Sequence, residues 1–238
     1  MVFNIFNRLF IGLSLVIVVF STYFFKLDSY LIMLFLILIS YDFLIIKIIN
    51  RILISILILI SFSLILFFPH EYLKYLCFIQ SLIIFFTIFN DKFKKEFFLF
   101  SLYIFCMILF YISVIDRNIF YLIILISFFN DTVAYISGKS IGGKLIVPNI
   151  SPNKTWSGTL ISFFATIILL TFLDNYLLIS ILSAIFLFLG DIFFSYIKRY
   201  LKIKDFSNLL GGHGGILDRL DSMFFLAIIF QIHLVFIK

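Results

Sequence analysis

Charged residues are scarce in this chain. They make up 13% of its 238 residues, whereas hydrophobic residues make up 64% and the mean hydropathy is +1.24. A soluble domain carries about 25% charged residues. The composition therefore excludes a soluble domain and indicates a single integral membrane domain over residues 1–238.

Cysteine and tryptophan are rare as well. Cys77 and Cys106 lie in apolar segments without a second thiol or a histidine at ligand spacing, which indicates small buried side chains rather than a metal site. The one tryptophan, Trp156, is typical of an interfacial belt residue. The net charge of +6 does not indicate nucleic acid, because the basic residues lie in short loops between apolar segments.

Long apolar runs are abundant. A transmembrane helix needs about 20 mostly apolar residues, and a barrel strand would alternate instead. The chain is therefore predicted to be an all-α polytopic membrane protein. The nine transmembrane helices that we expect cover residues 9–25, 30–46, 52–68, 73–89, 97–115, 119–137, 157–173, 176–197 and 216–237.

The basic residues predict the orientation of these helices. With the N-terminus in the cytoplasm, most of the 18 basic residues fall in cytoplasmic segments, as the positive-inside rule requires. The exceptions are Lys26, Lys74, Arg117 and Lys238. We expect a multi-pass protein of the cell (inner) membrane, with its first helix retained because no small-residue cleavage site follows it.

Two long loops, 138–156 and 198–215, face the cytoplasm in this topology, and both are rich in Gly, Lys, Ser and Asn. The first half, 1–118, has short loops and no polar cluster, although Asp42 lies within an expected helix without an assigned role. Residues 1–118 are accordingly predicted to be a scaffold, and residues 119–238 to be the catalytic part.

Ten charged or histidine residues stand between Gly190 and Ser222. A charge at membrane depth costs about 2.5–3.5 kcal/mol, so such groups normally line a polar cavity. Asp218 and Asp221 are expected on one face of a first helical turn, where a carboxylate pair favours Mg²⁺. The simpler alternative is that both acids complement the helix N-terminus.

The preceding apolar run ends with Asp191, Ser195, Lys198 and Arg199. Spacings of four and seven place Asp191, Ser195 and Lys198 on one helical stripe. Lys198 and Arg199 could instead be ordinary snorkelling charges, whereas an acid such as Asp191 inside an apolar run is a functional candidate.

Lys204 and Asp205 lead into Gly-Gly-His-Gly-Gly at 211–215. Glycines at 211, 212, 214 and 215 would let backbone N–H groups approach phosphate oxygens. His213 is open to two interpretations, a site residue or a local hydrogen-bonding residue of the loop.

The other cytoplasmic loop follows Asp131, an acid at the end of an expected helix. Ser151 is expected to cap a turn that Pro152 fixes, and Thr155 to cap the next helix. Lys154 would then point toward the same polar cavity as Lys198.

These residues resemble a known family. The run Ser195-x2-Lys198-Arg199-x4-Lys204-Asp205-Phe206, followed by GHGG at 212–215 and Asp218-Arg219-x-Asp221, resembles the motif of the phosphatidate cytidylyltransferase (CDP-diacylglycerol synthase) family. Residues 131–158 are similar to its second shared block. Three positions depart from the pattern, namely Gly211 in place of proline, Phe194 in place of an acid and Ser157 in place of Glu or Gln.

The resemblance implies a Mg²⁺-dependent nucleotidyltransferase of phospholipid biosynthesis, which transfers CMP from CTP to phosphatidic acid. It implies CTP, phosphatidic acid and membrane lipids as partners at a site facing the cytoplasm. A second cation and a homodimer are compatible with it.

The metal ligands expected are Asp191, Asp218 and Asp221. The catalytic residues expected are Asp191, Lys198, Arg199, Lys204, Asp205, His213, Asp218 and Asp221. The substrate-binding residues expected are Asp131, Lys139, Lys144, Ser151, Lys154, Thr155, Ser195, Gly212, Gly214, Gly215 and Arg219.

Three other classes of protein remain alternatives. A lipid kinase that uses CTP should lack the full motif run. A transporter should distribute its intramembrane acids over both halves of the chain. An inactive scaffold would share the motif without turnover.

Overall fold

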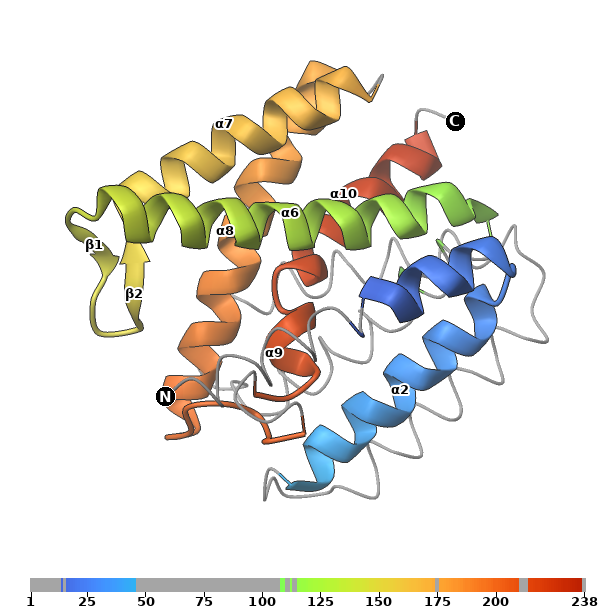
Figure 1. The fold of residues 1–238 in the computed structure, drawn as a ribbon, viewed down its shortest axis with the longest axis horizontal. Coiled ribbons are helices and arrows are strands. Elements are labelled where there is room, and N and C mark those ends of the chain that lie inside the picture. The colour runs from blue at the N-terminus through green and yellow to red at the C-terminus, as the bar shows by residue number, and fades with distance from the viewer. Residues whose placement is uncertain are drawn as a thin grey trace. The chain divides into compact units, whose positions relative to one another are not determined.

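The structure is a computed structural model that describes residues 14, 16–45, 108, 109, 112, 115–173, 176–209 and 214–236. Its helices are α2 (Asp28–Ile45), α6 (Arg117–Ile141), α7 (Trp156–Phe172), α8 (Leu177–Tyr200), α9 (Leu217–Leu220) and α10 (Met223–Phe236), and its strands are β1 (Leu145–Val147) and β2 (Ser151–Thr155) (Figure 1). Residues 16–24 are also helical. The expected helices at 52–68 and 73–89, and most of 97–115, lie outside the described residues.

The chain forms two compact units. Unit 1 comprises residues 1–117 and 203–220, and unit 2 comprises residues 118–202 and 221–238. The segment 203–220, which the motif pattern assigned to the catalytic half, therefore packs with the N-terminal residues.

Long apolar helices dominate the described part of the chain, as predicted. α6 has 25 residues and α8 has 24, and both are long and apolar enough to cross a membrane. They extend the expected ranges 119–137 and 176–197 by a few residues, because hydropathy does not detect helical turns that continue past the apolar run. These helices support membrane association, and the number of membrane crossings stays a prediction.

α8 packs against both α7 and α10 in unit 2. Aromatic rings fill the layer between α8 and α10, where Phe193 stacks on Phe224 with ring centroids 6.0 Å apart and meets Phe225 edge to face at 5.5 Å. Offset and edge-to-face pairs of this kind add about 0.5–1.5 kcal/mol each beyond their buried area. Phe194 is buried in the same layer, so a ring packs where the family pattern has an acid.

Buried polar side chains join α6 to its neighbours. Thr166 on α7 donates a hydrogen bond to Asn130 Oδ1 on α6 at 3.3 Å. Ser127 on α6 shares a hydrogen bond with Ser222, which lies just before α10. Because an unpaired polar group is expensive in an apolar interior, these bonds fix the register of α6 against both elements.

The loop 138–156 contains a short β-hairpin, which the sequence did not predict, while the described part of the chain is otherwise mostly helical, as expected for an all-α membrane protein. Gly142 and Gly143 have φ angles of +66° and +116°, a left-handed conformation that ends α6 and turns the chain. β1 and β2 then pair antiparallel, with Leu145 opposite Thr155 and Val147 opposite Ser151. The turn falls at residues 148–150, so the turn predicted at Ser151 and Pro152 was wrong.

The last expected helix, 216–237, is broken. α9 ends at Leu220, residues 221 and 222 form a turn, and α10 begins at Met223. The Asp221 side chain accepts a hydrogen bond from the Ser222 N–H at 2.8 Å, a local bond that competes with continued helix. The prediction that Asp218 and Asp221 share one helical turn was therefore wrong, because the helix ends between them.

In unit 1, α2 is anchored at its first residue. Arg117 forms an ion pair with Asp28, with Nε to Oδ2 at 3.2 Å, and its guanidinium lies 4.9 Å from the centroid of the Tyr23 ring. The first residue of α2 is therefore a paired acid rather than a solvated one.

We predict that Gly158→Val destabilises unit 2. A Cβ at Gly158 would lie 2.7 Å from the Ala134 carbonyl oxygen and 3.1 Å from Gly138 Cα, so α6 and α7 would have to separate. Overpacking of this kind costs about 1–3 kcal/mol and should lower the unfolding temperature of the purified protein in detergent. Leu160→Ala, at an exposed position on the same helix, is the control. Equal unfolding temperatures for Gly158→Val and the unmodified protein would contradict the close contact.

Candidate active site

Unit 2 gathers three acids and two lysines, here named the acid–lysine cluster. Asp131 comes from α6, Lys154 from β2, Asp191 and Lys198 from α8, and Asp221 from the turn before α10. Asp221 is buried, and the other four lie close enough to act on its charge. Asp191 and Lys198 thus act on a common neighbour, as their predicted stripe on α8 requires.

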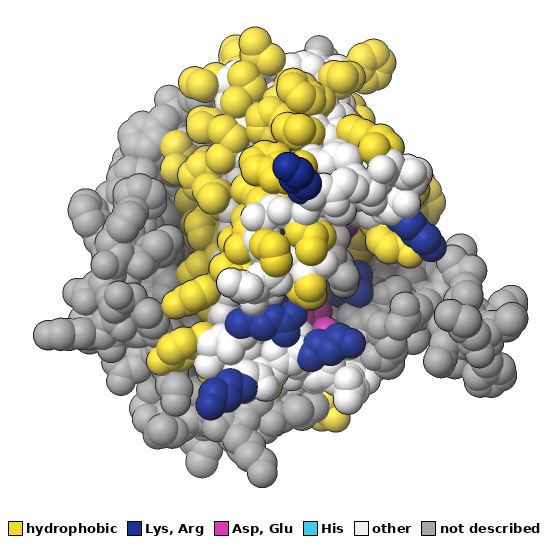
Figure 2. Space-filling view, turned by 90° about the vertical axis from the view of Figure 1, so that its left-hand side faces the viewer, with side chains coloured by type: hydrophobic (Ala, Val, Ile, Leu, Met, Phe, Trp, Pro, Cys, Tyr) yellow, Lys and Arg dark blue, Asp and Glu magenta, His cyan; other side chains and the backbone are white. Residues whose placement is uncertain are grey.

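Each lysine of the acid–lysine cluster neighbours a different acid. Lys154 forms an ion pair with Asp191, and its Nζ lies 5.9 Å from the centroid of the Phe188 ring. Lys198 Nζ lies 4.0 Å from Asp221 Oδ2. Asp131 adds a third carboxyl group, so acidic groups outnumber ammonium groups in the cluster and oxygen donors are left for a hard cation. Figure 2 shows basic side chains around a small acidic patch on the face that carries the hairpin.

Gly190 brings the backbone of α8 against the turn that carries Asp221. A Cβ at Gly190 would lie 3.0 Å from the Asp221 carbonyl oxygen and 3.2 Å from the Phe225 ring. Because Gly190 directly precedes Asp191, this contact governs how closely Asp191 and Asp221 approach each other. Sequence reasoning gave this residue no role, since one glycine in an apolar run is a weak signal.

Arg199 connects α8 to the hairpin that carries Lys154. Its Nε donates a hydrogen bond to the Ile150 carbonyl oxygen in the hairpin turn, at 3.0 Å. A charge expected to neutralise phosphate therefore also holds the hairpin against α8, and so supports the position of Lys154.

Thr155 and Ser157 fix the other end of the hairpin. Thr155 is the N-cap of α7, as predicted, and its Oγ1 accepts a hydrogen bond from the Gly158 N–H at 3.2 Å. Ser157 Oγ donates to the Gly142 carbonyl oxygen. The family pattern has Glu or Gln at this position, and here a short hydroxyl closes the base of the hairpin.

Unit 1 holds the rest of the described motif. Asp218 Oδ2 accepts hydrogen bonds from the Phe206 N–H at 2.9 Å and from the Gly215 N–H at 2.8 Å. Gly214 has a φ angle of +81°, and a Cβ there would lie 2.6 Å from the same oxygen. The Gly215 N–H, expected to face phosphate, thus donates to Asp218. Asp218 therefore holds Phe206 and Gly215 together, on either side of the glycine motif at 211–215; residues 206–217 are here named the motif segment.

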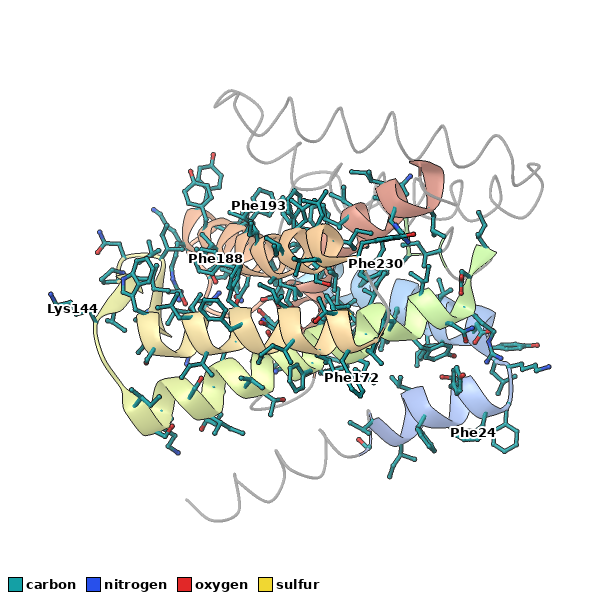
Figure 3. The ribbon with its side chains drawn as sticks, turned by 90° about the horizontal axis from the view of Figure 1, so that it is seen from above. Phe24, Lys144, Phe172, Phe188, Phe193 and Phe230 are labelled. Carbon is teal, nitrogen blue, oxygen red and sulfur yellow. The ribbon has the colours of Figure 1, made fainter. Side chains whose placement is uncertain are left out.

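The remaining predicted residues that the structure describes have the following positions. Lys139 lies in the last turn of α6, with its Nζ 5.7 Å from the centroid of the exposed Tyr135 ring. Lys144 extends outward from the hairpin (Figure 3). Ser195 is buried on α8, Ser151 and Arg219 are half-buried, and Lys204 and Asp205 are exposed. Gly212 and His213 lie outside the described residues.

Apolar helices that gather carboxylates and lysines define a membrane-associated protein with a polar, charged centre. A family model described as the Cytidylyltransferase family matches residues 2–237, so the chain belongs to this family.

The chain is also similar to individual members. A phosphatidate cytidylyltransferase of Rickettsia bellii is 41% identical over 113 residues, which cover 39% of this chain and 47% of that protein. A phosphatidate cytidylyltransferase of Aquifex aeolicus is 38% identical over 151 residues, which cover 60% of this chain and 57% of that protein. The chain spans about half the length of the curated relatives it matches.

We predict that Gly190→Ala lowers activity more than stability. The added methyl group would press on the Asp221 carbonyl oxygen and shift Asp221 relative to Asp191, and a displacement of about 1 Å at a catalytic centre can cost about 100-fold in rate. Turnover and unfolding temperature should be measured on the same detergent-purified sample. Ser183→Ala, a buried position elsewhere on α8, is the control. Gly190→Ala with full turnover would show that the spacing of the two acids is not critical.

Proposed function

We propose that the protein is a phosphatidate cytidylyltransferase that transfers CMP from CTP to phosphatidic acid, giving CDP-diacylglycerol and pyrophosphate. The observation that carries the proposal is the acid–lysine cluster, in which Asp191 and Asp221 from separate elements are each neighbours of a lysine. Membership of the cytidylyltransferase family, and the names of the relatives, supply the substrate class.

The reaction requires little proton transfer by the protein. An oxygen of the phosphatidate phosphate attacks the α-phosphorus of CTP and forms a new P–O bond. The bond to the β-phosphate oxygen breaks, and its electron pair leaves with pyrophosphate. Because the nucleophile is already an oxyanion, catalysis depends on positioning and on neutralisation of charge.

The residues of the acid–lysine cluster fit a magnesium ion. In the described ranges no three His, Cys, Asp or Glu side chains come together as a closed metal cage. Mg²⁺ does not require one, because it usually takes one or two carboxylates together with waters and substrate phosphates. Asp191 and Asp221, both in unit 2, would hold the ion, and the ion would supply charge neutralisation at the triphosphate. The metal role of Asp218 stays a prediction from the motif pattern.

The lysines would neutralise the phosphate charge that the metal ion does not. Lys154 and Lys198 are already within the acid–lysine cluster, where exchange of a carboxylate partner for a phosphate oxygen keeps each ammonium group beside an anion. Exposed Lys139, Lys144 and Lys204 would meet the nucleotide or the lipid headgroup as it arrives. The site faces the cytoplasm in a multi-pass inner-membrane protein, where CTP enters from water and phosphatidate from the bilayer.

Asp221→Asn and Asp191→Asn should each lower kcat by about 100–1000-fold, since they remove charge at the reacting phosphates with little change in shape. Purified enzyme is incubated with labelled CTP, phosphatidate and Mg²⁺, and the liponucleotide and pyrophosphate are counted. Chelation of Mg²⁺ should stop the reaction and its return should restore it. Asp28→Asn removes an acid that pairs with Arg117 and should leave turnover unchanged.

Two results would count against this function. Unmodified protein that forms no liponucleotide would exclude the reaction. Asp221→Asn that retains a tenth or more of the activity would exclude the metal role of that residue.

Lys198→Ala tests whether Lys198 binds substrate or only snorkels. Loss of one phosphate contact should raise KM for one anionic substrate by about tenfold, equivalent to about 1.4 kcal/mol of binding. Lys202→Ala, on an exposed residue beyond the end of α8, is the matched control. Unchanged kinetic constants for both substrates would assign Lys198 to the membrane interface alone.

A further inference from the structure

Asp42 is a buried carboxylate that the proposed chemistry does not use. It lies on α2 with none of its surface exposed. Its Oδ1 accepts a hydrogen bond from Ser207 Oγ, and its Oδ2 accepts one from the Leu217 N–H at 2.9 Å. Buried charge is retained only where such bonds compensate its lost hydration, so this arrangement is specific to the two donors.

The two donors lie on either side of the glycine motif. Ser207 follows Phe206, at the start of the motif segment, and its Oγ also accepts from the Leu209 N–H at 3.2 Å. Leu217 begins α9, where the motif segment ends. One carboxylate on α2 therefore joins the beginning of the segment to its end.

Gly215 leaves the room that this junction needs. A Cβ at Gly215 would lie 2.5 Å from Asp42 Oδ2 and 2.7 Å from Ser207 Oγ. No other side chain fits without displacing the acid, so glycine at this position has a packing reason as well as a conformational one.

Asp218 binds the same segment with its own carboxylate. It accepts from the Phe206 and Gly215 N–H groups, and it lies close enough to Asp42 to act on its charge. The two acids have different roles. Asp218 joins residues within the motif segment, whereas Asp42 attaches the segment to α2.

We propose that Asp42 is a positioning residue, which fixes residues 206–209 and 214–217 against α2 and thereby sets the position of Asp218 and of the neighbouring Lys204. The inference rests on the proposed cytidylyltransferase function. It gives Asp42, in the N-terminal half of the chain, the role of holding motif residues of unit 1 in place, beyond that of a scaffold.

The test compares Asp42→Ala, Asp42→Asn and Ser207→Ala, with Asp28→Asn as the matched control on the same helix. Two quantities are measured on detergent-purified protein. One is kcat per folded enzyme in the liponucleotide assay. The other is the rate of trypsin cleavage after the exposed residues Lys202 and Lys204, because proteolysis follows the population of the locally opened segment.

Asp42→Ala and Ser207→Ala should each speed cleavage by about fivefold or more and lower kcat by about tenfold, with a smaller change in KM. The double variant should cleave no faster than Asp42→Ala, because both changes break the same contact. Asp42→Asn should retain more activity than Asp42→Ala. Its amide oxygen can accept from the Leu217 N–H, and its amide N–H can donate to the Ser207 hydroxyl. Asp28→Asn should behave as the unmodified protein.

Two outcomes would overturn the proposal. Ser207→Ala and Asp42→Ala with unmodified cleavage and turnover would show that the contact positions nothing. Asp42→Asn as inactive as Asp42→Ala, with cleavage at the unmodified rate, would show that the charge acts directly. Should the unmodified protein form no liponucleotide, the enzymatic function fails, while the cleavage rates still decide whether Asp42 holds the segment.

Discussion

A carboxylate inside an apolar body must have a partner, and this constraint organises both units. In unit 2, Asp191 and Asp221 are compensated by Lys154 and Lys198, which come from a hairpin and from the end of a helix. In unit 1, Asp42 and Asp218 are compensated mainly by backbone N–H groups and a hydroxyl. The difference is functional as well as structural. Lysine partners can exchange a carboxylate for a phosphate oxygen, whereas backbone partners bind the acid permanently into the fold.

Close backbone contact is the second requirement for this arrangement. Gly158 lets α7 approach α6, Gly190 lets α8 approach the turn at Asp221, and Gly215 admits the side chain of Asp42. Gly158 lies beside Thr155, Gly190 beside Asp221 and Gly215 beside Asp42. Each of these neighbours is a proposed site residue or holds one in place. Helix packing through small residues, common in membrane proteins, here also sets the distances between charged groups.

The long helices could be predicted because a continuous apolar run is a strong and local signal. The charged residues of the acid–lysine cluster stand out in the sequence because charges are rare in such a chain, and their catalytic roles stay a prediction. The hairpin at Leu145–Thr155 could not, since its strands are too short for a periodic pattern and its supports, Arg199 and Ser157, are recognised only in three dimensions. The break at Asp221 depends on a side-chain bond to Ser222 and on the proximity of Gly190, which hydropathy does not detect. Asp42 could be recognised as an unusual acid in an apolar run, but its donors could not be predicted because Ser207 and Leu217 lie far along the chain.

The return of residues 203–220 to unit 1 has a consequence for biosynthesis. While the ribosome is still making the middle of the chain, α2 is complete but Asp42 has neither Ser207 nor Leu217 to bind. A charge in an apolar helix without its hydrogen-bond donors disfavours final assembly, so the first unit is complete only after residues 203–220 emerge. Early helices thus wait for late ones, and a fragment ending near residue 117 would lack Ser207 and Leu217, the donors that bind Asp42 in the described part of the chain.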